Sequence, residues 1–337
     1  MKMSKKIYNF QIKIKSPVHI GCGEEFDITN FYIDREKKKL INFNVSDFIS
    51  KLNERGKLNE FENKCKSSDL KTVVSFINEF FKNNENRVAG YELEVPNDLI
   101  DHYNNCLQNP NLFNQFQIFR TAYLPYNNMP YIPGSSIKGA LRTAFLEYKR
   151  EKRKINNIPN DFISYYKGKT KYNIKGLEKN LLDDRDRVSI FSCVKVSDFL
   201  PKNGVKRKVV YVLNFYKNSD NRTKNLYHIL EVITEGTFNG TIEIISKDNL
   251  NRDFQDISIE KLLEASKKYY QNFNNNQNLN NSVIIKMGIH KGIEYLTLKF
   301  ENPKTATTEW LASDTQKPDN KNNLKEFGII EIINQKN

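Results

Sequence analysis

Tyr131-Ile-Pro-Gly-Ser-Ser-Ile-Lys-Gly-Ala-Leu-Arg-Thr-Ala-Phe145 carries the strongest structural signal in the chain, because a loop ends there and an amphipathic helix begins. Pro133 favours an extended backbone, Gly134 permits an unusual φ angle, and Ser135 and Ser136 can each cap the free N–H groups of a helix start. Apolar residues then recur at helical spacing, at Ile137, Ala140, Leu141, Ala144, Phe145 and Tyr148. This spacing predicts a helix with one face in the core.

A second face of the same predicted helix carries Lys138 and Arg142, one turn apart. Two like charges at this spacing disfavour an isolated helix unless an anion lies over them, and a helix N-terminus also favours phosphate. Gly134, Ser135, Ser136, Lys138 and Arg142 are therefore candidate phosphate-binding residues. The alternative, in which both cations are only solvated, stays open. A Walker-type nucleotide loop is excluded, because Ala140 and Leu141 follow Gly139 where that motif needs Lys and Ser or Thr.

The composition indicates a globular protein with a polyanionic partner. The 337 residues include 53 Lys and Arg against 40 Asp and Glu, a formal charge of +13. The chain is also rich in Lys, Asn and Ile, a bias that AT-rich coding alone can produce, so the placement of the charges matters more than their sum. Four isolated cysteines indicate neither a zinc site nor a disulfide framework, and no apolar run approaches the length of a membrane span. We expect a cytoplasmic protein without membrane association.

The N-terminal part predicts a strand, a glycine turn and a helical insertion. Phe10, Ile12 and Ile14 alternate with polar residues, which places Lys13 and Lys15 on the outer face of a strand. The turn that follows contains His19, Gly21 and Gly23, and its backbone N–H groups could approach a ligand. Next come a hairpin with strands at Phe26–Ile33 and Leu40–Phe43, and a helical block at about 46–120.

The C-terminal part is richer in expected strands. These are Val188–Val196, Val209–Phe215, Tyr227–Ile233, Phe238–Ile245, Val283–Met287, Tyr295–Phe300 and Phe327–Ile333. We expect a turn at Glu235-Gly236, a capped helix from Ser258 to Phe273, and an irregular segment from Pro303 to Lys325. A second glycine-bounded loop, Gly288–Gly292, contains the cationic candidates His290 and Lys291.

Together these patterns predict an α+β fold of two modified ferredoxin-like domains. The first covers residues 1–185, including the helical insertion, and the second covers residues 186–337.

Tyr131–Arg142 resembles the signature of the RAMP superfamily of CRISPR RNA-binding proteins, and Ser16–Glu25 resembles that superfamily's N-terminal strand and turn. Further likeness narrows the resemblance to the Csm-complex RAMP subunit that caps the crRNA 3′ end in type III-A systems. The segments that carry this further likeness are the large insertion, Val196-Ser197-Asp198, Glu231–Phe238, Gly288–Gly292 and Pro303-Lys-Thr305.

The resemblance implies RRM-like folds whose signature helix and glycine loops hold the crRNA backbone. It also implies contact with a neighbouring backbone RAMP subunit of the Csm complex, a supporting role in crRNA maturation and antiviral defence, and host nucleases as recruited partners. It implies no dedicated active site and no cofactor. No RNP1-like aromatic string is present, so base stacking on the sheet is not expected.

Catalytic chemistry has weak support. His19, His102, His228 and His290 are scattered and lack the spacing of metal ligands. His19 could act as an acid or base in RNA cleavage, which makes an endoribonuclease the alternative function, but we favour a histidine that packs at the turn. Asp27 and Asp34 are expected to be surface carboxylates. A third possibility is an interaction protein that recruits others through its helical insertion.

Overall fold

A computed structural model gives the fold of the chain. It describes residues 3–66, 69–109, 112, 116–167, 169–182, 189–247, 257–274, 281–295, 298, 300 and 307–335. Over these residues, thirteen strands join in one mixed sheet, and two more form a separate hairpin. The α+β class is therefore confirmed. The predicted domain boundary at 185/186 and Pro303–Thr305 lie outside the described residues.

One part of the sheet, together with two helices, has the chain order of a ferredoxin-like unit. The order is β1 (Met3–Ile14), α5 (Gly134–Lys152), β9 (Val194–Val196), β11 (Arg222–Lys247), α7 (Ile259–Tyr269) and β15 (Ile329–Gln335). In space the strands run β15-β1-β11-β9, and every neighbouring pair is antiparallel. β12 (Ser282–Lys286) extends the sheet beyond β15. Strands from both predicted domains thus build one βαββαβ unit, and the two-domain division stays a prediction.

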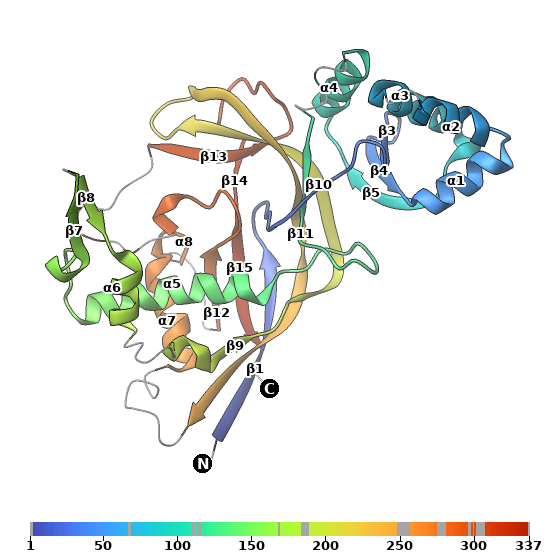
Figure 1. Cartoon of the computed structure of the whole chain (residues 1–337). Helices are drawn as coiled ribbons and strands as arrows, with labels where there is room; N and C mark the ends of the chain where they lie inside the picture. The colour runs from blue at the N-terminus through green and yellow to red at the C-terminus, as the bar shows by residue number, and fades with distance from the viewer. Residues whose placement is uncertain are drawn as a thin grey trace.

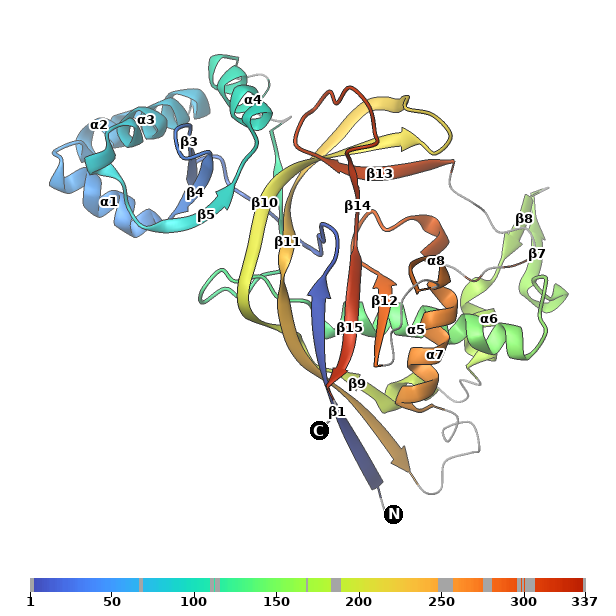
Figure 2. The same cartoon turned by 180° about the vertical axis from the view of Figure 1, so that it is seen from behind.

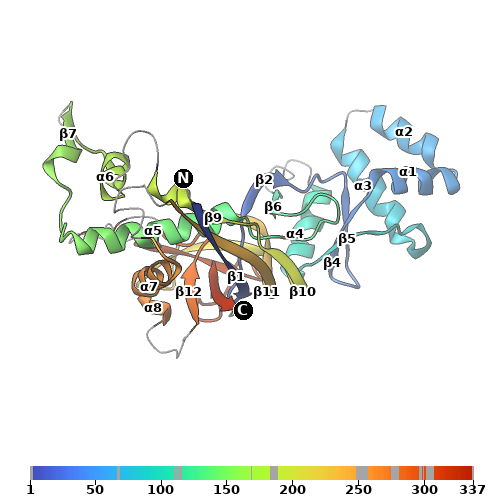
Figure 3. The ribbon, with the colours of Figure 1, turned by 90° about the horizontal axis from the view of Figure 1, so that it is seen from below.

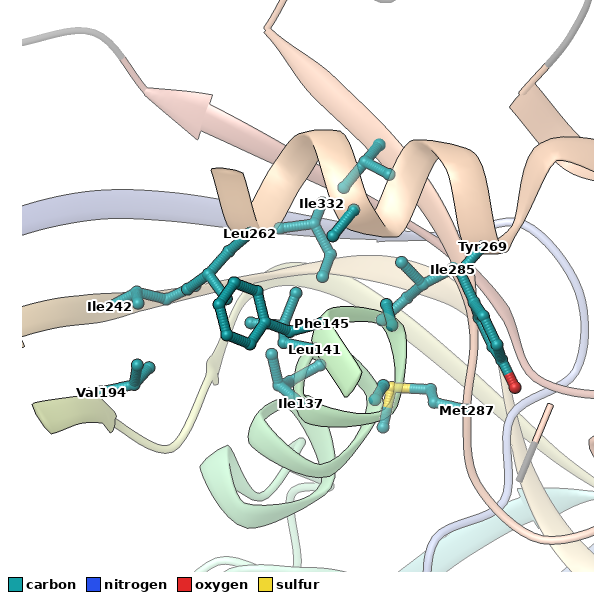
Figure 4. Packing of buried hydrophobic residues seen from close by; sticks show 14 of the residues in the cluster. Ile137, Leu141, Phe145, Val194, Ile242, Leu262, Tyr269, Ile285, Met287 and Ile332 are labelled. Atoms are coloured by element: carbon teal, nitrogen blue, oxygen red, sulfur yellow. The ribbon is translucent and has the colours of Figure 1, made fainter. Parts of the chain in front are cut away.

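The core of this unit lies between the sheet and the two helices (Figure 4). Ile137, Leu141 and Phe145 of α5 are fully buried, which confirms the predicted apolar face. They meet Leu262 of α7 and strand residues such as Ile242. Ser258 caps α7 by accepting a hydrogen bond from the Lys261 N–H, so that predicted helix start is confirmed too.

β11 is one continuous strand of 26 residues, so the turn expected at Glu235-Gly236 is wrong. Gly236 has a φ of 143°, and a Cβ there would lie 2.9 Å from the Val205 Cγ2 atom. The register with β10 (Leu200–Tyr216) shifts repeatedly around this point. Gly236 therefore lies at an irregularity in the pairing of β10 with β11, and the chain does not reverse there as the sequence suggested. The first half of β11 pairs with β10 and the second half with β1 (Figure 2).

The rest of the sheet carries the helical insertion. β10 pairs with β5 (Gly90–Glu94), and the sheet continues through β4 (Lys39–Phe43) to β3 (Phe31–Asp34). α1 (Val45–Glu54), α2 (Leu58–Lys66) and α3 (Leu70–Lys82) form a lobe at the upper right of Figure 1. Aromatic contacts fill that lobe, including the stacked rings of Tyr32 and Phe81. α4 (Asn97–Gln108) packs its buried face, which includes Leu99 and Tyr103, in a cluster with strand β10.

Short elements complete the chain. They are β2 (Gly21–Glu25), β6 (Ile118–Thr121), β7 (Ile163–Tyr166), β8 (Lys169–Tyr172), α6 (Ile174–Leu181), α8 (Gln271–Asn274), β13 (Thr308–Ser313) and β14 (Lys325–Glu326). Three expectations are corrected here. Ile190–Cys193 is a 3-10 turn within an expected strand, the 3-10 turn Ile293–Tyr295 includes the first residue of the strand expected at Tyr295–Phe300, and β13 lies inside the segment expected to be irregular.

Candidate nucleic-acid interface

The start of α5 is held by the end of β9 and the residues after it. A Cβ on Gly134 would lie 2.4 Å from the Val196 carbonyl oxygen, so glycine is required there by close packing. Its φ is not positive, which corrects the expected reason. The Gly134 N–H donates to the Asp198 Oδ1 atom at 2.8 Å, while Ser135 and Ser136 make no capping bond. An aspartate of the chain itself therefore occupies the helix end expected to bind phosphate.

The two cations of α5 also bind groups of the chain. Lys138 donates from Nζ to the Val194 carbonyl at 2.7 Å, and burial lowers its pKa. Arg142 forms an ion pair with Glu178 of α6 at 2.9 Å. The expectation that both side chains are free to hold phosphate is wrong for this structure. Phosphate binding by either residue would require an exchange of partners.

The two predicted glycine loops lie against each other. The Ile289 N–H donates to the His19 carbonyl at 3.0 Å. A Cβ on Gly288 would lie 2.5 Å from that same oxygen, and one on Gly21 would lie 2.8 Å from the Ile289 Cδ1 atom. Gly288 also has a φ of 82°, so it needs glycine for its backbone as well as for space. Residues far apart in sequence, Gly21 and His290 among them, thus share one surface region.

His19 is packed inside this junction. It is 2% exposed, its Nδ1 atom lies 2.7 Å from the Glu231 carbonyl oxygen, and burial lowers its pKa. The side chain is therefore not open to RNA in this structure, and the packed histidine is confirmed. Asp27 is exposed, with Oδ1 accepting from the Thr29 N–H, whereas Asp34 is buried in an ion pair with Arg87, which corrects its expected place on the surface.

His290 and Lys291 lie at the partly exposed edge of the junction. The His290 ring lies 4.7 Å from the Trp310 ring and 5.6 Å from the His228 ring. Burial, and then the nearby His228 and His19, lower the pKa of His290 to about 4. Burial also lowers the pKa of Lys291.

The outer face of β1 is polar. Phe10 and Ile12 face the helices, so Asn9, Gln11 and Lys13 point to the opposite side, where Asn9 and Lys13 are exposed. Thr237, Asn239 and Thr241 of β11 lie beside them in register. Lys15 is also exposed and forms an ion pair with Glu331 at 2.9 Å. The outward placement of Lys13 and Lys15 is confirmed, and Lys13 lies on a polar face of the sheet.

A buried ionic network that local sequence patterns do not reveal supports the junction. Glu231 is 0% exposed and accepts hydrogen bonds from the Tyr91 hydroxyl and the Thr121 N–H. Arg207 lies beside it, contacting Glu231 and Tyr91. Burial raises the pKa of Glu231, and the hydrogen bond from Tyr91 and the charge of Arg207 oppose that rise. The one sequence feature that could have indicated this network is Glu231 itself, a glutamate inside an otherwise apolar strand.

The described residues show neither a candidate metal site nor a candidate membrane span. No group of three or more His, Cys, Asp or Glu side chains there has the geometry of a metal site. No helix in that part of the chain combines the length and apolar character needed to cross a membrane.

Fold, signature helix and glycine junction together define one class of protein, and a family comparison agrees: residues 11–327 match the RAMP superfamily. The chain belongs to that superfamily. It is similar to two proteins named CRISPR system Cms protein Csm5. It is 27% identical to the one from Streptococcus thermophilus over 67% of this chain, and 28% identical to the one from Methanocaldococcus jannaschii over 77%. The matches span 60% and 59% of those relatives.

Two solved structures share the fold. One is a chain of a Csm–crRNA–target RNA ternary complex of a type III-A CRISPR-Cas system, determined by cryo-EM. Its TM-score is 0.57 at 15% identity, over 98% of this chain and 100% of that chain. The other is a crystal structure of Csm5 from T. onnurineus, with a TM-score of 0.56 at 17% identity, over 96% and 99% of the two chains.

Proposed function

We propose that this chain is a crRNA-binding subunit of a type III-A Csm ribonucleoprotein complex. It grips the crRNA backbone near its 3′ end and supports crRNA maturation and antiviral defence. The observation that carries the proposal is the polar outer face of β1, with Lys13 exposed, on a chain whose two glycine loops are joined by a hydrogen bond. Its relatives named Csm5 and its fold likeness to a chain of a Csm–crRNA complex support the choice of RNA and complex.

Backbone contacts, rather than base readout, fit this surface. Gly21 and Gly23 are exposed in β2, and a Cβ on Gly23 would meet nothing within 4 Å, so RNA can approach the main chain at Gly23 without meeting a side chain. Lys13, Lys15, His290 and Lys291 supply cations or donors around the glycine junction. Phosphate contacts position RNA without reading its sequence, so the grip is largely sequence-independent.

The start of α5 has a secondary part in this proposal. Ser135 is exposed and can reach RNA directly, whereas Ser136 is half-buried. Lys138 and Arg142 make no phosphate contact while they bind Val194 and Glu178.

The proposed partners are crRNA, a neighbouring backbone RAMP subunit of the Csm complex, and recruited host nucleases. The subunit itself is proposed to be a binding component rather than an enzyme, acting in the cytoplasm. Burial of His19 supports this, since a general acid or base must reach the proton it transfers.

Salt-titrated binding of single-stranded crRNA tests the proposal. Replacing Lys13 or Lys291 with alanine should weaken binding about equally for all sequences. Each change should reduce the log–log salt slope by about 0.7, the value for one phosphate of a single strand. Lys66→Ala, which removes an exposed lysine from the α1–α3 lobe, is the matched control and should leave the slope unchanged. Unchanged slopes for both test variants would contradict the proposed surface.

Cleavage is tested separately. Labelled crRNA incubated with excess protein, with and without divalent metal, should stay intact in both conditions. Cleavage that disappears in His19→Ala, in protein with an unchanged unfolding midpoint, would show an endoribonuclease instead.

A further inference from the structure

A small hairpin outside the main sheet carries an unusual surface. β7 and β8 pair antiparallel and form their own two-stranded sheet. The hairpin connects α5 to α6 and projects from the body at the end opposite the α1–α3 lobe (Figure 3). All its described residues from Ser164 to Tyr172 are exposed. An isolated two-stranded hairpin is only marginally stable in water. Because these side chains are exposed and pack in no core, packing does not explain why they are there.

Tyrosines and lysines make up most of the surface of this hairpin. Tyr165, Tyr166 and Tyr172 are 79%, 56% and 51% exposed. The loop and second strand supply Lys167, Lys169 and Lys171, and residues 163–172 contain no acidic residue. Within the described part of the chain, these lysines have no ion-pair partner. The hairpin therefore presents three positive charges without compensation.

The two faces of the hairpin differ. Tyr166 faces the same side as Lys169 and Lys171, and the Lys171 Nζ atom lies 4.5 Å from the centre of its ring. On the opposite face, Tyr165 is paired with Thr170, and Tyr172 is its diagonal neighbour. Diagonal neighbours lie about 7–8 Å apart, within reach of consecutive bases of an extended strand. No ring contact for Tyr165 or Tyr172 occurs among the described residues.

We propose that the β7–β8 hairpin is a second contact for single-stranded RNA, separate from the glycine junction. Bases stack on Tyr165 and Tyr172 on one face, and the backbone passes around the edge of the hairpin so that Lys167 at its tip and Lys169 and Lys171 on the other face bind the phosphates. Aromatic faces combined with cations are the means by which proteins hold single strands without reading sequence. An acidic protein segment would use the lysines but leave the open rings unexplained. This inference rests on the proposed function, and it adds a contact that the glycine junction does not require.

Tyrosine variants of the full-length chain test the stacking. Tyr165→Ala/Tyr172→Ala should weaken binding of fluorescent single-stranded RNA by about tenfold or more, since stacking on each aromatic contributes measurably. Tyr165→Phe/Tyr172→Phe keeps the rings and should bind like the unmodified chain. Urea midpoints should be unchanged in both, because the side chains are exposed. The loss should be equal for a crRNA 3′ segment and an unrelated sequence, and much smaller for duplex RNA.

Lysine variants test the phosphate contacts. Replacing Lys167, Lys169 and Lys171 with glutamine should reduce the salt slope by about 2, from three phosphates at about 0.7 each. Lys57→Gln/Lys66→Gln/Lys82→Gln changes the net charge equally on the α1–α3 lobe and should leave the slope unchanged.

The outcomes separate the two proposals. If the unmodified chain binds single-stranded RNA and all hairpin variants bind equally well, the hairpin inference is overturned and the proposed function stands. If the unmodified chain does not bind RNA, both fall. Loss of a co-purifying protein subunit with unchanged RNA affinity would identify the hairpin as a protein contact and overturn the inference.

Discussion

The start of α5 and the β7–β8 hairpin are both basic in sequence, but the structure uses their charges differently. Lys138 and Arg142 bind a carbonyl and a carboxylate of the chain, while Asp198 occupies the helix end. Lys169 and Lys171 are exposed on a hairpin that touches little else. The difference shows that a basic motif in the signature helix can hold the fold together, while a lysine-rich connection supplies available charge.

The largest effect that we expect in these two regions is a loss of stability on substitution of Gly134, at the start of α5. Gly134→Ala should lower the free energy of unfolding by about 3 kcal/mol, because its Cβ would meet the Val196 and Ser197 carbonyl oxygens and force the backbone apart. Urea unfolding measures this.

Gly139→Ala is the matched control on the same helix. A Cβ there meets nothing within 4 Å, so the gain in helix propensity should stabilise the protein by about 0.5–1 kcal/mol. Equal effects at both glycines would mean that the helix start is not clamped.

A smaller effect is expected on acidification, at the glycine junction. The folded-state pKa of His290, about 4, lies below its usual value, so the unfolded chain binds a proton first as pH falls. Stability should therefore be complete above about pH 6.5 and decline toward pH 4. At pH 5 the His290 contribution is a loss of about 1 kcal/mol, discounted for partial exposure.

His290→Asn tests this because asparagine tolerates the φ of 64° found there. The variant should lose less stability between pH 7 and pH 5 than the unmodified chain, in urea titrations at each pH. His19, whose pKa is also lowered, supplies part of the remaining decline. An identical decline in both proteins would exclude His290 as a cause.

The smallest expected effect is at the Arg142–Glu178 pair. Both side chains are partly exposed, so Arg142→Ala should cost about 0.5 kcal/mol. Its salt slope for RNA should stay unchanged, whereas Lys169→Ala should reduce that slope by about 0.7. A reduced slope for Arg142→Ala would show that RNA displaces Glu178, and it would remove the contrast between the two regions.

Local patterns in the sequence predicted much of the fold. The apolar spacing of Ile137, Leu141 and Phe145 identified the face of α5, and alternation around Phe10 and Ile12 identified β1. Both signals come from burial of one face at a fixed period. Gly236 misled because glycine favours a turn and a strand irregularity equally, and only the opposing Val205 distinguishes them.

The site was harder to predict because its contacts are distant in sequence. Nothing near Gly134 indicates that Asp198 would cap it, and nothing near Glu231 identifies Tyr91 as its donor. Residue type alone suggested His19 as an RNA contact, although its neighbours bury it. The availability of a cation depends on its partners, which for Lys138 and Arg142 come from later elements.

The position of β1 has a consequence for synthesis. Its partners are the second half of β11 and the terminal strand β15. At about 5–20 residues per second, the ribosome needs roughly 10–45 s after Ile14 to reach Thr237. During that interval Phe10 and Ile12 have no sheet to join. The apolar face of the first strand therefore stays unpaired for most of synthesis, which makes β1 the strand of this sheet that is exposed longest to aggregation.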